Sequence, residues 1–171
     1  KYKKHIMGDA SEEPMPLYII PDRKVSLADV REGMRNHYEG TELSMTNDPG
    51  AGVYKVPYRW RPMTFKSEGR EYFNERAIAT QQTGFVLIAQ MRSWLPDAVG
   101  GILWFGVDDA NTAVLTPMYT SITEIPECYR RGNGSMTEFS WTSAFWIHNW
   151  VANMAYNRYE PMIRDIRPVQ K

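Results

Sequence analysis

Residues 74–119, NERAIATQQTGFVLIAQMRSWLPDAVGGILWFGVDDANTAVLTPMY, decide the fold. Three apolar runs in this stretch have the length and the composition of β-strands: residues 85–91, 102–107 and 114–119. Pro96 and a pair of glycines interrupt the chain between the first two runs. Between the last two, residues 108–111 supply a turn whose side chains can bond their own backbone. The pattern predicts an antiparallel meander that begins near Ala77 and ends near Tyr119.

A first helix is predicted over residues 27–39. Ser26 and Asp29 have the spacing of a capping box, and Gly40 provides a stop. Apolar side chains recur on one helical face at Leu27, Val30, Met34 and Tyr38. His37 would then lie at the end of the helix, where it complements the helix dipole.

A second helix is predicted over residues 142–159. It is apolar on nearly all sides, so it needs burial over most of its surface. One polar row of amides follows a four-residue spacing and would need partners if buried: Asn149, Asn153 and Asn157. Pro161 interrupts the pattern, and residues 162–169 continue as a kinked or separate helical turn. Elsewhere we expect a short edge strand at 17–20 and irregular chain at 41–66 and 121–134.

The composition limits the classes of function. A length of 171 residues suits one domain, and 20 basic side chains balance 20 acidic ones, so the electrostatic footprint of a nucleic-acid-binding protein is absent. No apolar run approaches the roughly 20 residues that cross a bilayer. The single cysteine, Cys128, excludes an intrachain disulfide and leaves the compartment open. The three histidines lack zinc-site spacing, so neither a metal nor another cofactor is expected.

Arginines are the main candidates for a binding or catalytic site. Arg76 stands where the chain enters the predicted sheet, and its permanent charge could orient a carboxylate or a catalytic group. An ion pair with Glu71 or Glu75 is the competing interpretation. In the segment VPYRWRPMTF, Arg59 and Arg61 alternate with aromatic residues and could hold a carboxylate, although a packed aromatic loop is the simpler interpretation.

Two other features favour structural roles. Asp108 and Asp109 could be paired carboxylates for acid–base chemistry, but their place between two strands favours a hairpin turn. Cys128 has Arg130 and Arg131 nearby, yet it carries no local signature of a nucleophile. We therefore interpret it as a spectator thiol in a loop.

Three long segments resemble the dipeptidase A family of bacterial cysteine peptidases, which are N-terminal-nucleophile hydrolases: HYEGTELSMTNDPGAGVYKVPYRWRP, NERAIATQQTGFVLIAQMRSWLPDAVGGILWFGVDDA and FWIHNWVANMAYNRYEPMIRDI. The resemblance covers residues 17–170. It implies an α+β fold in which the antiparallel β-meander, packed with helices, is part of an αββα sandwich. It also implies hydrolysis of dipeptides or short peptides by an N-terminal Cys whose α-amino group is the base.

The resemblance further suggests which residues support the reaction. Arg76 matches an arginine that lies near the nucleophile in related amidases, and Asn47, in the sequence Thr-Asn-Asp-Pro, resembles an asparagine that helps to hold the oxyanion. Arg59 and Arg61 would bind the substrate carboxylate. Position 1 is Lys, so the nucleophile would stand outside this segment. We expect residues 1–171 to be one domain from the downstream portion of a longer hydrolase, inactive without the remainder of the parent chain.

Two alternatives remain at this point. The same fold could serve an acylamide hydrolase or an acyltransferase, and the chain could instead be a non-catalytic, aromatic-rich binding domain. The binding domain predicts a stable monomer with a closed core, whereas a severed hydrolase predicts an exposed apolar surface that meets another copy or a partner. A homo-oligomer therefore stays open.

Overall fold

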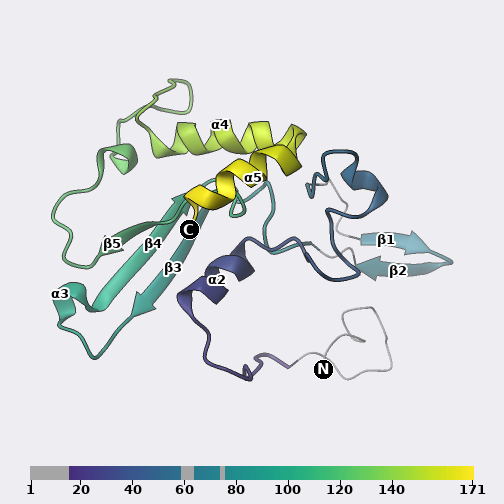
Figure 1. The fold of residues 1–171 in the computed structure, drawn as a ribbon, viewed down its shortest axis with the longest axis horizontal. Coiled ribbons are helices and arrows are strands. Elements are labelled where there is room, and N and C mark those ends of the chain that lie inside the picture. Colours follow the sequence, from purple (N-terminus) through teal and green to yellow (C-terminus); the bar gives the residue numbers. More distant parts are fainter. Residues whose placement is uncertain (1–15, 59–63, 74–75) are drawn as a thin grey trace.

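The computed structural model describes residues 16–58, 64–73 and 76–171, and it has an α+β fold (Figure 1). The helices are α2 (Leu27–Met34), α3 (Asp97–Gly100), α4 (Ala144–Asn157) and α5 (Tyr159–Val169), with 3-10 turns η1 (Pro49–Ala51) and η2 (Glu127–Tyr129). The strands are β1 (Thr64–Ser67), β2 (Arg70–Phe73), β3 (Phe85–Met91), β4 (Gly101–Val107) and β5 (Thr116–Tyr119). The predicted class, an antiparallel meander packed with helices, is confirmed.

The meander forms the three-stranded sheet β3-β4-β5, antiparallel throughout. Its register pairs Val86 with Gly106 and Leu103 with Met118. The first two strands match the predicted runs, whereas β5 begins two residues later than expected, at Thr116. Gly106 is needed for its close approach, because a Cβ there would lie 2.9 Å from the backbone oxygen of Val114.

A separate two-stranded sheet, β1-β2, was not predicted (Figure 1). Its turn places Glu68 at φ 49° and Gly69 at φ 76°, the left-handed pair that matches the twist of a two-residue hairpin. The predicted irregular chain over 41–66 is therefore wrong at its end, where β1 begins at Thr64. The predicted edge strand at 17–20 is also wrong, because this segment has no strand and its side chains are exposed.

Helix α2 starts as predicted and ends early. Asp29 N donates to Ser26 Oγ over 3.2 Å, and Ser26 N donates to Asp29 Oδ2 over 2.8 Å, which confirms the capping box. The helix ends at Met34 rather than at residue 39. A side chain stops it, since Asn36 Oδ1 accepts the amide of Tyr38 over 2.7 Å and competes with the helical ladder. His37 lies beyond the helix, so its predicted role at the helix dipole is wrong.

The helix predicted over 142–159 is α4, and the helical continuation predicted over 162–169 is the separate helix α5. The break falls at Arg158, with φ −139° and ψ 56°, and not at Pro161. Pro161 stands in the first turn of α5, where a missing N–H leaves no helical bond unmade. The Asn row of α4 is satisfied within the helix: each Nδ2 donates to the carbonyl four residues earlier, from Asn149 over 2.7 Å and from Asn153 over 2.8 Å. Several apolar side chains of α4 are nevertheless exposed, namely Phe145, Ile147, Trp150 and Met154.

The two faces of the meander differ. Val86 lies on the buried face, where it packs with Ala79 and Ala110 and contacts Met34 from α2. Alternate residues point to the other side of a strand. That side carries a group that we call the exposed sheet face: Phe85 (60% exposed), Leu87 (49%), Met91 (75%) and Leu103 (39%). The binding-domain alternative requires a closed core with no large exposed apolar face. The described residues instead leave this apolar face exposed.

Candidate functional site

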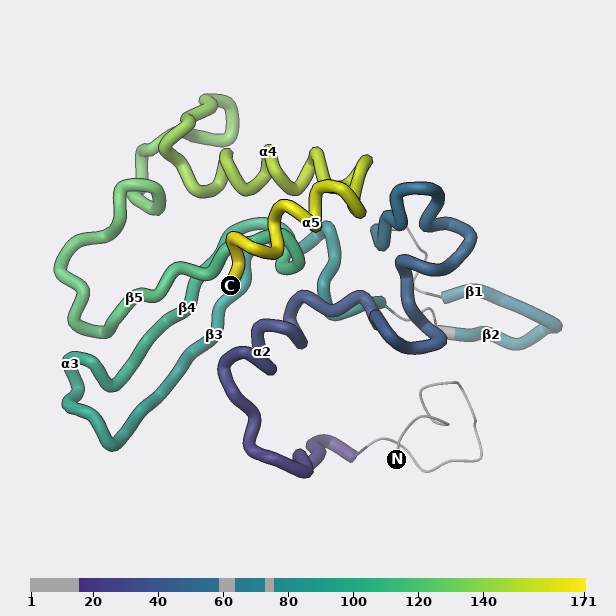
Figure 2. Tube along the Cα trace, in the orientation of Figure 1, coloured from purple at the N-terminus to yellow at the C-terminus, as the bar shows by residue number. Residues whose placement is uncertain are grey.

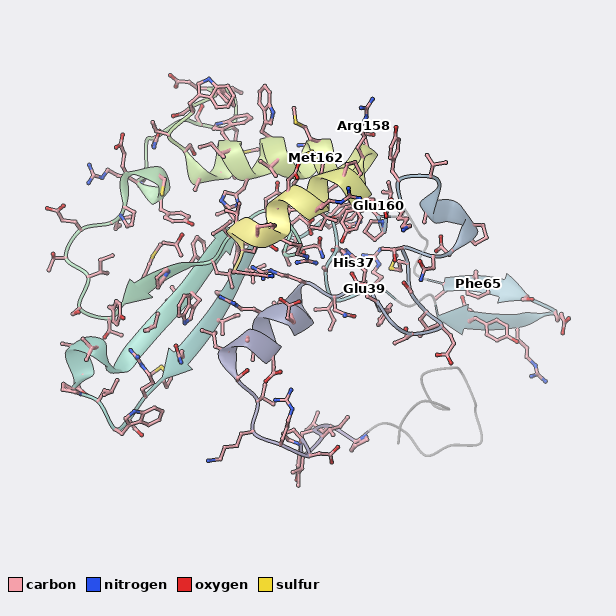
Figure 3. All side chains as sticks on the ribbon, viewed as in Figure 1. His37, Glu39, Phe65, Arg158, Glu160 and Met162 are labelled. Carbon is pink, nitrogen blue, oxygen red and sulfur yellow. The ribbon has the colours of Figure 1, made fainter. Side chains whose placement is uncertain are left out.

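The most unusual feature of the molecule is a cluster of polar side chains, buried except for the half-buried Tyr58, which we call the buried polar cluster: His37, Tyr58, Asp109, Asn111 and Tyr159. Its members come from the chain after α2, the segment before residue 59, the β4–β5 loop and the start of α5. Figure 2 shows the β4–β5 loop running against α5, and Figure 3 places His37 and Glu39 below this helix. The site is built where four segments distant in sequence meet.

Asn111 connects most of these segments and is fully buried. Its Nδ2 donates to the carbonyl of Arg35 over 2.6 Å and lies 3.3 Å from His37 Nδ1. Its Oδ1 accepts the hydroxyl of Tyr159 over 3.0 Å, and its backbone oxygen accepts Gln170 Nε2 over 2.9 Å. A buried amide is tolerated when its donors and acceptors are bonded, and this one joins the end of α2 to both ends of α5.

Asp109 is the buried carboxylate of the cluster. It accepts the hydroxyl of Tyr58 and, over 3.2 Å, the backbone amide of Asn111. Burial raises its pKa above the ordinary value, against the opposing effect of these hydrogen bonds. Burial, and then the nearby Asp109, raises the pKa of Tyr58 far above its usual range, so Tyr58 remains a hydrogen-bond donor. The bond between Asp109 and the amide of Asn111 confirms the predicted turn. The turn pattern did not indicate that Asp109 is buried.

Asp108 is also buried, with its backbone in the left-handed region at φ 67°. Burial raises the pKa of its carboxyl to about 6, although a backbone hydrogen bond from Asp109 opposes the shift. Asp tolerates this backbone conformation better than most residues. The two neighbouring carboxyls are therefore both harder to ionise than a surface Asp, and they occupy different environments.

Glu39 lies beside the buried His37 and has 38% of its own side chain exposed. Glu39 Oε2 accepts the backbone amide of His37 over 2.6 Å, and Oε1 lies 3.5 Å from His37 Nδ1. Burial acts to raise the pKa of Glu39, but the hydrogen bonds from His37 outweigh it and the pKa is lowered. The imidazole of His37 packs edge-on against Tyr58 and Tyr159 at centroid distances of 5.3 and 6.1 Å, and its Nε2 has no partner among the described residues.

Arg76, the first predicted site residue, has an exposed side chain at the entry to the meander. Its backbone oxygen accepts the hydroxyl of Tyr38 over 2.6 Å. The structure records no ion pair between Arg76 and Glu71 within the described residues, and Glu75 lies outside them. The competing structural ion pair therefore gains no support from Glu71.

Asn47, the second predicted site residue, lies in a turn in which its backbone amide donates to the backbone oxygen of Ser44 over 3.4 Å. Its side chain is exposed and forms no hydrogen bond within the described part of the chain. Two residues earlier, the amide of Met45 donates to the oxygen of His37 over 3.1 Å. The chain beside Asn47 is therefore bonded to His37, and the main chain of Arg76 is bonded to Tyr38. The side chains of Asn47 and Arg76 form no hydrogen bond with each other. Arg59 and Arg61 lie outside the described residues.

Cys128 lies in η2 and is half-buried. It lines a cavity of about 370 Å³ together with Arg130, Arg131 and Trp146. No hydrogen bond to its sulfur is recorded among the described residues. The interpretation as a spectator thiol stays a prediction.

Over 16–58, 64–73 and 76–171 no group of three or more His, Cys, Asp or Glu side chains could hold a metal ion. In the same part of the chain, no helix has the length and apolar character needed to cross a bilayer.

The whole chain, residues 1–171, matches Peptidase family C69, and the chain belongs to this family. It is 28% identical to Probable dipeptidase B of Lactococcus lactis subsp. lactis (strain IL1403), over 97% of this chain and 31% of the relative. It is 26% identical to Probable dipeptidase of Latilactobacillus sakei, over 92% of this chain and 30% of the relative. It is 21% identical to Dipeptidase A of Lactobacillus helveticus, over 89% of this chain and 28% of the relative.

These matches confirm the family that the resemblance indicated. The chain spans less than a third of the length of these curated relatives. No solved structure matches it.

Proposed function

We propose that the protein to which these residues belong hydrolyses the amide bonds of dipeptides. The observation that carries this proposal is the match to Peptidase family C69 over the whole chain, together with relatives named as dipeptidases. The substrate is a dipeptide or a short peptide.

In the proposed mechanism, the nucleophile is an N-terminal Cys outside residues 1–171. Its thiolate attacks the substrate carbonyl after the α-amino group has taken the thiol proton. The tetrahedral oxyanion collapses to an acyl-thioester, the leaving amine takes the proton, and water then hydrolyses the thioester. Residues 1–171 alone would hydrolyse nothing.

The described residues would support this reaction through Arg76 and Asn47. Both side chains are exposed, and neither forms a hydrogen bond within the described part of the chain. They contrast with the buried polar cluster, whose amide and carboxylate are already engaged. A free amide N–H of Asn47 is suited to donate to the developing oxyanion, and the guanidinium of Arg76 to orient a carboxylate. Arg59 and Arg61 are proposed to hold the substrate carboxylate.

We also propose that the exposed sheet face is one side of an interface between residues 1–171 and the remainder of the protein. Apolar surface of this kind is stabilised when another element covers it, at about 25 cal/mol per Å². The relatives are more than three times as long as the matched segment, so further chain is available in proteins of this family.

The proposal is tested by assaying the full-length protein on a panel of dipeptides and, in parallel, on N-acyl amides. A dipeptidase cleaves dipeptides with the higher kcat/KM. Faster cleavage of the acyl amides would instead identify an acylamide hydrolase or acyltransferase of the same fold. Failure on every dipeptide, with a folded protein, would overturn the proposal.

A further inference from the structure

Residues 36–38 connect the buried polar cluster to both segments that carry the proposed site residues. The backbone oxygen of Asn36 accepts the amide of Ala79 over 3.2 Å, and that of His37 accepts the amide of Met45 over 3.1 Å. The hydroxyl of Tyr38 donates to the backbone oxygen of Arg76 over 2.6 Å. Three consecutive residues thus bond to the chain beside Asn47 and to the chain at Arg76.

Tyr38 makes its contact from a disfavoured backbone conformation. Its φ is 63°, in the left-handed region that a bulky side chain rarely adopts. The neighbouring chain holds it there: Asn36 Oδ1 accepts its amide over 2.7 Å, and Thr41 donates to its carbonyl through Oγ1 over 2.7 Å. Such strain persists only where the surrounding structure imposes it, and it often marks a functional position. Here it accompanies a phenol that bonds to the main chain of Arg76.

The other side of residues 36–38 is fixed by buried contacts. Glu39 accepts the amide of His37, Asn111 bonds to the carbonyl of Arg35, and the rings of Tyr58 and Tyr159 confine the imidazole of His37. Any displacement of this segment would therefore break hydrogen bonds to the buried Asn111 and to Glu39, which is costly. These contacts fix the position of the segment on the side of the buried polar cluster.

We propose that residues 36–38 are a positioning segment that sets the placement of Arg76 and of the turn that carries Asn47, with Tyr38 as its principal positioning residue. The inference rests on the proposed function for the role of Arg76 and Asn47. Tyr38 acts through the main chain of Arg76. Small errors in the placement of a catalytic group, of about 1 Å, are enough to lower a rate by about 100-fold.

The test uses Tyr38→Phe in the full-length protein, with Tyr72→Phe as the matched control. Tyr72 lies in β2, is exposed and stacks on Phe65, and its hydroxyl forms no hydrogen bond with the described residues. We expect Tyr38→Phe to lower kcat on dipeptides about tenfold while KM stays within about twofold, because positioning is lost in the transition state. Tyr72→Phe should leave both constants unchanged.

A double-mutant cycle separates positioning from general destabilisation. If Tyr38 acts through Arg76, then Tyr38→Phe has little further effect on kcat in an Arg76→Ala background. Equal effects of Tyr38→Phe with and without Arg76 would overturn the inference.

Hydrogen exchange gives a readout that does not need activity. The amide of Ala79 is bonded to Asn36, so Tyr38→Phe should increase its exchange rate about tenfold, whereas Tyr72→Phe should not. Unchanged exchange at Ala79 would contradict the positioning role. If the unmodified protein does not hydrolyse dipeptides, the proposed function is wrong. The failure of the proposed function and the failure of the positioning role are therefore distinguishable.

Discussion

The buried polar cluster and the exposed sheet face differ in what they bury. The cluster buries polar side chains, whereas the sheet face exposes apolar ones. The cluster buries a carboxylate, an amide and an imidazole within the described part of the protein. The sheet face leaves Phe85, Leu87 and Met91 in contact with solvent. A buried polar group is costly unless it is bonded, so the cluster specifies one arrangement of its segments. Exposed apolar surface gains free energy only when it is covered.

The comparison indicates how the two regions contribute. The cluster fixes the local geometry around residues 36–38 by directional bonds from Asn111 and Glu39. The sheet face has no such directional partners and is suited to association with another surface. Helix α4 also carries exposed apolar surface, where Trp146, Trp150 and Met154 line a groove of about 420 Å³.

The largest expected effect on stability is that of Asn111→Leu. The substitution keeps the approximate volume but leaves the carbonyl of Arg35 and the hydroxyl of Tyr159 without their partner. We expect the free energy of unfolding to fall by about 2–4 kcal/mol, measured by urea denaturation. The matched control is Asn153→Leu on the exposed side of α4, with an expected change of about 0.5 kcal/mol or less. Equal effects of the two substitutions would remove the distinction between the regions.

The next effect concerns the exposed sheet face. Leu87→Ala in the full-length protein should lower the free energy of unfolding by about 2–3 kcal/mol if further chain covers this face, as we propose. The measurement is again the urea denaturation curve. A change near zero would show that Leu87 stays in water, and the proposed interface would be wrong.

A pH-dependent effect of intermediate size is expected from Asp108. Its pKa is raised in the folded state from the ordinary value of 3.8 to about 6, so ionisation opposes folding. The penalty is absent below about pH 4, grows as the pH rises to 6 and is constant above it. Asp108→Asn removes the ionisable group and is compatible with φ 67°, since Asn also tolerates this region. It should therefore stabilise the protein at pH 7 by about 1–2 kcal/mol and leave stability at pH 3.5 nearly unchanged.

Thermal unfolding of the native protein and the variant at pH 3.5, 5, 6 and 7 measures this difference. A difference that is independent of pH would show that Asp108 ionises normally in the folded state.

The smallest expected effect is local to the β1–β2 hairpin. Gly69 has φ 76°, and its absent Cβ would meet no other atom, so Gly69→Ala introduces only backbone strain. We expect a cost of about 1 kcal/mol, seen as faster hydrogen exchange in β1 and β2 with little change in the meander. Faster exchange in both sheets would show that the hairpin and the meander unfold together.

The meander could be predicted from the sequence because its strands and breaks are local patterns. The run over 85–91 matches β3 at both ends. One error occurred where a single side chain overrides a pattern, because Asn36 ends α2 early. The break between α4 and α5 falls at Arg158, before Pro161 is reached. The β1–β2 hairpin had a usable signal in Glu68-Gly69, which was missed among the surrounding loop residues.

The buried polar cluster could not be predicted in the same way. His37 and Asn111 are separated by 74 positions, and the bond between Tyr58 and Asp109 spans 51. No periodic pattern in a single sequence pairs residues at such distances. Arg76 and Asn47 came from the resemblance, and their roles remain proposals. Asp108 and Asp109 were correctly placed in a turn, but no pattern in the sequence indicates that Tyr58 reaches Asp109 from elsewhere in the chain.

The most direct test of the account is dipeptide hydrolysis by the full-length protein with Arg76 replaced. Arg70, in the exposed hairpin, provides the matched control. The account predicts that Arg76→Ala lowers kcat/KM at least tenfold, that Arg76→Lys restores only part of the loss, and that Arg70→Ala stays within about twofold of the unmodified protein. Equal activity of Arg76→Ala and Arg70→Ala would contradict the placement of Arg76 at the site of a Peptidase family C69 hydrolase.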